Sequence, residues 1–319
     1  MTNSESRRMT APRALASPAS LKGVLAARDA AAALEDGFVH VGIECDQLPL
    51  ADGGEGTIDA LCDEWDQHTV HDAFGRTRVA RVGRRDHGVV VEAAQVIPFD
   101  PTGHDVMHAS SRGLGELLAQ LQPAGPLVIG IGGTATMDGG EGLLEALDRL
   151  TAPTTVLCDV QTTLYDAPRL FGPQKGATPE QVAELERRLR ARADLAPYAD
   201  LPGAGAAGGL GAALASLGAE LVPGAAAVVE LAGFDPRPYG LVVTGEGRVD
   251  LTTAEGKAPA EVVLRCSVAG VPCVVFGGIV EELVPGAETI ALSGDPARAA
   301  RDLFELGLRL GTRLLDAAG

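Results

Sequence analysis

Three glycine-rich turns that carry acidic residues are the part of this sequence best suited to chemistry. They are residues 50–57 with Asp52 and Glu55, residues 130–140 with Asp138, and residues 244–250 with Glu246 and Asp250. Glycines let backbone amides approach an anion, and nearby carboxylates can hold Mg²⁺ or accept a proton. The pattern indicates a phosphate and metal site. Glycine beside an acid is also ordinary turn and helix-cap chemistry, and that alternative stays open.

Lysine is rare in this chain and always adjoins glycine. Only three of the 26 basic residues are lysines, namely Lys22, Lys175 and Lys257. A lysine is a compact point charge that suits a single phosphate oxygen. The three lysines therefore mark candidate phosphate or carboxylate contacts, although with 41 glycines in the chain the adjacency can also arise by chance.

Two further segments suit anions. Residues 203–208 match G-x-G-x-x-G, but no strand is predicted before them, so the dinucleotide-binding context is missing. A helix that opens on Gly205 and Gly208 still offers free amides. Arg112, beside Ser111 at a predicted helix start, suits a carboxylate, and an exposed helical turn is the alternative.

Composition excludes several functional classes. A net charge of −17 and a pI near 4.7 argue against binding to nucleic acids or anionic membranes, because the long-range field repels both. Aromatic residues make up 3% of the chain, too few for a base-stacking surface. Five cysteines without a C-x-x-C pair fit reduced thiols. With no apolar run long enough to span a membrane, we expect a cytoplasmic protein.

The elements that must position these turns alternate along the chain. Apolar, β-branched runs predict strands at residues 78–82, 88–93, 127–131, 155–158, 241–244, 272–276 and 289–292, with helical patterns between most of them. This alternation predicts an α/β protein with a doubly wound, mostly parallel sheet. The run from Arg78 to Ala93 instead predicts a hairpin, and so a second, mixed α/β domain inserted into the first. We expect residues 13–67 with 235–319 in one domain and residues 68–234 in the other.

Taken in order, these motifs resemble the bacterial glycerate kinase family, type I. The similarity runs from about Leu15 to Gly278, and all three lysines lie within it. Its motifs are residues 20–23, 51–57, 111–115, 130–140, 158–160, 171–177, 202–211, 244–250 and 256–257. The resemblance implies ATP-dependent phosphorylation of glycerate, with Mg²⁺, in the cleft between two different α/β domains. It leaves a homodimer open.

The resemblance and the residue types together assign roles. The expected catalytic residues are Asp52, Asp138, Asp159, Asp250 and Lys22. The expected metal ligands are Asp138, Asp159 and Asp250. Contacts to the substrate are expected from Arg112, Ser111, Glu55 and Lys175. Contacts to the nucleotide are expected from Gly132, Gly133, Thr134, Thr136, Gly205, Gly208, Glu246 and Lys257.

The sequence also departs from the family pattern. Ala19 stands where the family has a carboxylate, and Met137 replaces an amide side chain. The family's segment between Leu150 and Thr155 is largely missing. These departures leave two alternatives to glycerate phosphorylation: a non-catalytic paralogue that binds nucleotide or acid, and a kinase of another small hydroxy acid.

Overall fold

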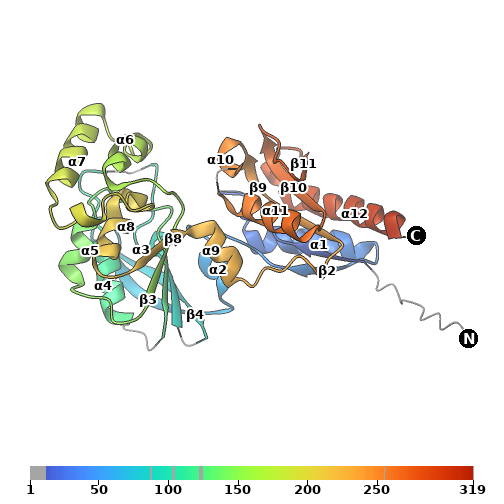
Figure 1. Cartoon of the computed structure of the whole chain (residues 1–319), viewed down its shortest axis with the longest axis horizontal. Coiled ribbons are helices and arrows are strands. Elements are labelled where there is room, and N and C mark those ends of the chain that lie inside the picture. The colour runs from blue at the N-terminus through green and yellow to red at the C-terminus, as the bar shows by residue number, and fades with distance from the viewer. Residues whose placement is uncertain (1–11, 87, 103–104, 122–124, 255, 319) are drawn as a thin grey trace, which may run out of the picture. The chain divides into compact units, whose positions relative to one another are not determined.

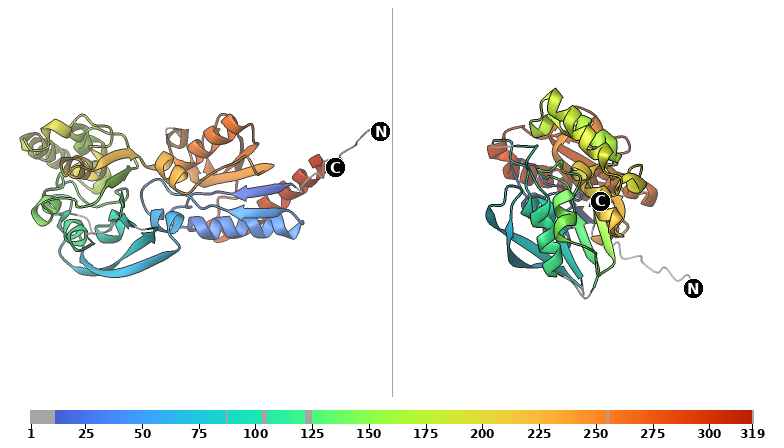
Figure 2. Two further views of the ribbon diagram at one scale, coloured as in Figure 1. Left: turned by 60° about the horizontal axis from the view of Figure 1, so that its bottom comes forward. Right: turned by 90° about the vertical axis from the view of Figure 1, so that its left-hand side faces the viewer.

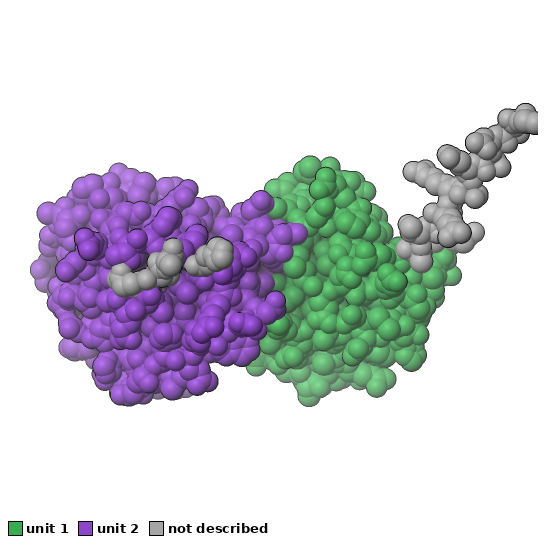
Figure 3. All heavy atoms as spheres, turned by 90° about the horizontal axis from the view of Figure 1, so that it is seen from below, with its two compact units in different colours: residues 1–49, 234–255, 259–319 green, residues 50–233, 256–258 purple. Residues whose placement is uncertain are grey.

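The computed structural model describes residues 12–86, 88–102, 105–121, 125–254 and 256–318 (Figure 1). Its strands form two separate sheets, and the predicted α/β class is confirmed. The chain divides into unit 1, residues 1–49, 234–255 and 259–319, and unit 2, residues 50–233 and 256–258, which Figure 3 colours green and purple. Unit 2 thus interrupts unit 1 in sequence.

Unit 1 is built on a fully parallel five-stranded sheet. Its strand order is β11 (Glu288–Ala291), β10 (Cys273–Val280), β9 (Leu241–Val249), β1 (Arg13–Ala16) and β2 (Glu44–Gln47). Helices α1 (Ala27–His40) and α12 (Ala299–Ala318) pack together against it, through a core that includes Phe38, Phe276 and Leu303. Figure 2 shows α11 (Ala258–Ala269) over the opposite face, so both faces of the sheet are covered.

Unit 2 is built on a mixed six-stranded sheet. The order is β3 (Glu64–His71), β4 (Thr77–Arg85), β5 (Gly88–Glu92), β6 (Leu127–Gly130), β7 (Thr154–Cys158) and β8 (Glu220–Pro223). The β3–β4 and β4–β5 pairs are antiparallel, and the remaining pairs are parallel. The hairpin predicted at Arg78–Ala93 is therefore β4–β5, and the two-sheet arrangement is confirmed.

Unit 2 also contains eight α-helices among its described residues. They are α2 (Thr57–Leu61), α3 (Ala93–Val96), α4 (Arg112–Leu121), α5 (Glu141–Ala146), α6 (Ala167–Phe171), α7 (Pro179–Ala191), α8 (Ala206–Ser216) and α9 (Gly224–Leu231), with short 3-10 turns at Leu164–Asp166, Pro173–Lys175 and Ala196–Tyr198. Thr178 begins α7 with a capping box closed by Gln181. In unit 1, Leu251–Ala254 forms α10, and a 3-10 turn at Pro296–Arg298 precedes α12.

The division between the units falls earlier than the sequence indicated at one end. We expected residues up to 67 to belong with unit 1, but β3 pairs along its whole length with β4. Helix α2 contacts β4 and β5. Residues from Leu50 onward therefore belong to unit 2. No helix among the described residues is long and apolar enough to cross a membrane.

Candidate active site

The turn at residues 52–57 lies across the carboxyl ends of β6 and β7. The amide of Gly132, just after β6, donates to the carbonyl oxygen of Gly53 at 3.1 Å. A Cβ atom on Gly130, the last residue of β6, would lie 2.5 Å from that same oxygen. Glycine is therefore required at Gly130, because only a residue without a side chain lets the turn approach the strand so closely.

Asp159 follows β7 directly and lies beside the same turn. A Cβ atom on Gly132 would lie 2.9 Å from Asp159 Oδ2 and 2.9 Å from the Cα of Gly54. The Asp52 carboxylate accepts a 3.2 Å hydrogen bond from the Gly54 amide. Three segments distant in sequence thus bring two carboxylates and a glycine turn together at one edge of the sheet, where α/β proteins bind ligands.

Lys175 is buried next to this edge. Its Nζ donates a 2.9 Å hydrogen bond to the carbonyl oxygen of Thr136. Burial lowers the pKa of Lys175 from 10.5 to about 8, and the negative charges of Asp159 and Asp138 act in the opposite direction. A lysine held in this way supplies a positive charge close to Asp159.

The start of α8 packs against the same segment. Ala207, Gly208 and Gly209 all have left-handed backbone conformations, and Ala207 does so although it has a side chain. The Gly139 amide donates to the Gly208 carbonyl oxygen at 3.0 Å, and Gly208 lies so close to Thr136 that an added Cβ would be 2.3 Å from its carbonyl oxygen. Strained backbone of this kind is found at ligand sites, which supports the predicted role of this loop.

Thr134 and Gly133 belong to the turn that follows β6. The Thr134 side chain is buried, and its hydroxyl has no hydrogen-bond partner among the described residues. Gly133 is exposed, with a left-handed backbone. The turn therefore combines one accessible position with one buried hydroxyl.

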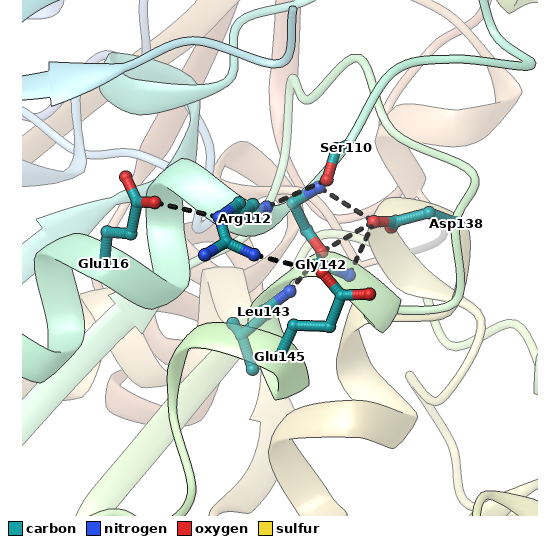
Figure 4. Close-up of polar contacts among 8 residues, drawn as sticks. Ser110, Arg112, Glu116, Asp138, Gly142, Leu143 and Glu145 are labelled. Atoms are coloured by element: carbon teal, nitrogen blue, oxygen red, sulfur yellow. Dashed lines mark hydrogen bonds and ion pairs between the residues drawn. The ribbon is translucent and has the colours of Figure 1, made fainter. Parts of the chain in front are cut away.

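Asp138 occupies a different position from the other acids, at the junction of α4 and α5 (Figure 4). Its Oδ2 accepts hydrogen bonds from the amide and the hydroxyl of Ser111, both at 2.8 Å, and from the Gly142 amide at 3.2 Å. Its Oδ1 accepts from the Gly140 amide at 3.1 Å. The Ser111 hydroxyl in turn accepts from the Leu143 amide at 2.9 Å. Asp138 and Ser111 thus tie the starts of two helices together.

Arg112 is exposed and engaged in ion pairs. Its guanidinium donates to Glu116 at 3.0 Å and to Glu145 at 3.1 Å (Figure 4). The predicted contact between Arg112 and a substrate carboxylate would have to replace one of these partners. It stays a prediction.

Unit 1 groups a smaller set of the expected residues. The Ala19 amide donates to the Gly245 carbonyl oxygen at 2.9 Å. The Thr253 hydroxyl donates to Glu246 Oε1 at 2.8 Å and accepts from the Asp250 amide at 3.0 Å. Lys22 is exposed, and its backbone nitrogen would lie 3.3 Å from a Cβ added to Gly247. The segments that carry Lys22, Glu246 and Asp250 therefore lie next to one another in unit 1.

Glu55, Gly205 and Lys257 are the remaining expected residues. Glu55 is exposed in the 52–57 turn, Gly205 is buried at the start of α8, and Lys257 is half-buried just before α11. Within the described part of the chain, no three His, Cys, Asp or Glu side chains group closely enough to hold a metal. Mg²⁺ bound together with phosphates needs only one or two carboxylate ligands from the protein, so a single carboxylate such as Asp159 is compatible with a Mg²⁺ site.

Sequence reasoning missed Glu92, which is 1% exposed at the carboxyl end of β5. The one available signal was an acid that directly follows the apolar run Val89–Val91.

Comparison with known proteins decides the family. A model of the glycerate kinase family matches residues 14–152 and 148–293. The chain belongs to the glycerate kinase family. The two matched segments overlap at residues 148–152.

Relatives in this family cover most of the chain. It is 34% identical over 320 residues to a glycerate kinase of Bacillus subtilis (strain 168), covering 82% of this chain and 83% of that protein. It is 34% identical over 299 residues to a glycerate 2-kinase of Escherichia coli (strain K12), covering 76% and 78%. A crystal structure described as that of a glycerate kinase 2 from Salmonella typhimurium LT2 superposes with a TM-score of 0.82 at 28% identity, over 97% of this chain and all of that one.

Proposed function

We propose that this protein transfers the γ-phosphoryl group of Mg-ATP to a hydroxyl group of glycerate. The observation that carries the proposal is the convergence of Asp52, Asp159 and Lys175, with two glycine turns, at the carboxyl ends of β6 and β7. Family membership and the activities for which the relatives are named support the same reaction.

Phosphoryl transfer requires positioning and neutralisation of charge more than covalent chemistry. The buried ammonium of Lys175 would compensate negative charge on a phosphoryl oxygen, and the amides of the turn that follows β6 would contribute partial positive charge. Asp52 is the candidate acceptor of the hydroxyl proton. Lys22, Glu246 and Asp250, in unit 1, stay sequence-based predictions for the same reaction.

Asp159 is the residue that we propose to hold Mg²⁺. It is exposed, and the neighbouring Gly132 has no side chain to block its carboxylate. Mg²⁺ held by Asp159 would supply positive charge to neutralise the transferred phosphate. Asp138 fits less well, because both of its oxygens already accept hydrogen bonds from backbone or side-chain donors. We propose that Asp138 supports the fold of the site.

A substrate screen tests the proposal. Purified protein is given Mg-ATP and each of a panel of small hydroxy acids, and both ADP and the phosphorylated acid are measured. Phosphoglycerate formed with glycerate at the highest kcat/KM supports the assignment. A higher kcat/KM for another acid would make the protein a kinase of that acid, and nucleotide binding without turnover would identify a non-catalytic paralogue.

A further inference from the structure

Glu92 is a buried carboxylate that the reaction as described above does not use. Its side chain is 1% exposed at the end of β5. Oε1 accepts a 2.6 Å hydrogen bond from the Ile58 amide, and Oε2 accepts a 3.2 Å hydrogen bond from the Gln95 side chain. Because each oxygen faces a donor, the geometry matches the ionised form of Glu92.

The Ile58 amide lies in the first turn of α2, directly after the segment 52–56. The N-cap residue of that helix is Gly56, which has a left-handed backbone and no side chain to accept hydrogen bonds from the free amides of the first turn. The acceptor for Ile58 therefore comes from Glu92, 34 residues further along the chain. Glu92 thus fixes the point where the segment 52–56 enters its helix.

The same segment is held at two other places. The Thr57 hydroxyl donates to the Gly54 carbonyl oxygen at 2.7 Å, and the Gly132 amide holds Gly53. Helix α2 is held as well, because Arg81 of β4 pairs with both oxygens of Asp59, at 2.8 and 3.1 Å. The restraints from several elements suggest that the exact position of this turn matters.

Burying an ionised carboxylate costs its hydration free energy, which is a large cost for a hydrogen bond to a single backbone amide. Burial raises the pKa of Glu92 above its ordinary value, although the donors Ile58 and Gln95 act in the opposite direction. A glutamine at this position could accept the same hydrogen bond without the loss of carboxylate hydration. The hydrogen bond and the charge can therefore be separated by substitution.

We propose that Glu92 is a positioning residue for phosphoryl transfer, which acts through Ile58 to hold Asp52 and Glu55 in the geometry that the reaction needs. This inference rests on the proposed function. A displacement of reacting groups by about 1 Å costs on the order of 10²-fold in rate. The effect should appear mainly in kcat, because Asp52, the candidate acceptor of the hydroxyl proton, lies on this turn. Of the four expected substrate contacts only Glu55 lies there too.

The test compares Glu92→Leu, which removes the acceptor, with Glu92→Gln, which keeps it. Val82→Ala serves as the matched control, since Val82 is buried in β4 of the same sheet, in the hydrophobic core with Val70 and Val91. We expect Glu92→Leu to lower kcat by about 10²-fold with KM values changed by less than about 3-fold. Glu92→Gln should keep kcat within about 5-fold of the wild type, and Val82→Ala should lose stability but keep kcat.

The NMR signal of the Ile58 amide gives a readout that is independent of activity. Its downfield shift should disappear in Glu92→Leu and remain in Glu92→Gln. If the wild type is active but folded Glu92→Leu keeps its kcat, or Glu92→Gln loses as much as Glu92→Leu, the inference is overturned and the proposed function stands. A wild type inactive on every hydroxy acid would overturn the proposed function, and the inference with it.

Discussion

The ammonium group of Lys175 donates a 2.9 Å hydrogen bond to the carbonyl oxygen of Thr136, and the lysine side chain is almost wholly buried. This contact joins the 3-10 turn before α7 to the turn that follows β6. It also places a positive charge near Asp159, the proposed Mg²⁺ ligand, and the desolvation of that charge lowers the pKa of Lys175 to about 8.

The first prediction concerns the pH dependence of stability. The pKa of Lys175 is lower in the folded chain, so the unfolded chain binds more protons between pH 8 and 10, and folding becomes more favourable as pH rises through that range. Lys175→Met removes this titration. Relative to that variant, the wild type should gain about 2 kcal/mol in unfolding free energy from pH 8 to pH 10. Urea unfolding at several pH values measures the difference, and parallel curves would contradict the prediction.

The second prediction concerns Gly132. Gly132→Ala places a methyl group 2.9 Å from Asp159 Oδ2 and 2.9 Å from the Cα of Gly54, so these groups must move apart. We expect kcat/KM to fall by about 10²-fold because the reacting groups are displaced. Gly240→Ala is the control, since its added methyl group would meet its nearest neighbour at 3.4 Å. Equal activity of the two variants would show that the close approach is unimportant.

The third prediction separates support from metal binding at Asp138. The Asp138 carboxylate accepts hydrogen bonds from the amide and hydroxyl of Ser111 and from the Gly142 amide. In Asp138→Asn one carboxylate oxygen is replaced by an NH₂ group, which is itself a donor and cannot accept these bonds. We expect a loss of about 2–4 kcal/mol in unfolding free energy. Asp148→Asn, at an exposed position, is the control and should lie within about 0.5 kcal/mol of the wild type. A stable but inactive Asp138→Asn would instead favour a direct role in the reaction.

The fourth prediction concerns Ala19, where the resemblance described above leads us to expect a carboxylate. Ala19 is half-buried beside Gly245, so a longer side chain has access to solvent. If a carboxylate there assists the substrate hydroxyl, its absence makes the wild type slow on glycerate. Ala19→Asp should then raise glycerate turnover by about 10²-fold or more, with the KM for ATP unchanged. Ala19→Asn is the uncharged control. Brisk turnover by the wild type, with no gain in either variant, would show that Ala19 is neutral.

Much of the fold could be predicted from apolar periodicity. The sequences of β4, β5, β6, β7, β9, β10 and β11 are β-branched and apolar. The start of α7 has residue types typical of a capping box, Thr178 and Gln181. Strands β1 and β2 were missed, because Arg-Ala-Leu-Ala and Glu-Cys-Asp-Gln have little strand propensity and are ordered by pairing with each other and with β9. Strand β3 was missed because it is a mostly exposed, polar edge strand.

The candidate site was predictable only in part, because many of its contacts join residues that are distant in sequence. Glycine turns with acids indicate where a chain can approach an anion, so the turn with Asp52 and the turn after β6 were found. One of the two ion-pair partners of Arg112 is Glu145, which is 33 residues away. One of the two donors to Glu92 is the Ile58 amide, which is 34 residues away. No spacing rule reveals such contacts, because they depend on how the sheet brings strand ends together.

The most direct test of the account is the rate at which phosphoglycerate forms from glycerate and Mg-ATP, compared between the wild type, Asp159→Asn and Asp148→Asn. Asp159 is the proposed Mg²⁺ ligand, and Asp148 is an exposed acid of the same unit. We predict that the wild type and Asp148→Asn form phosphoglycerate and ADP in equal amounts at similar rates, and that Asp159→Asn, although folded, is slower by at least about 10²-fold. Unchanged turnover in Asp159→Asn, or no phosphoglycerate from the wild type, would contradict it.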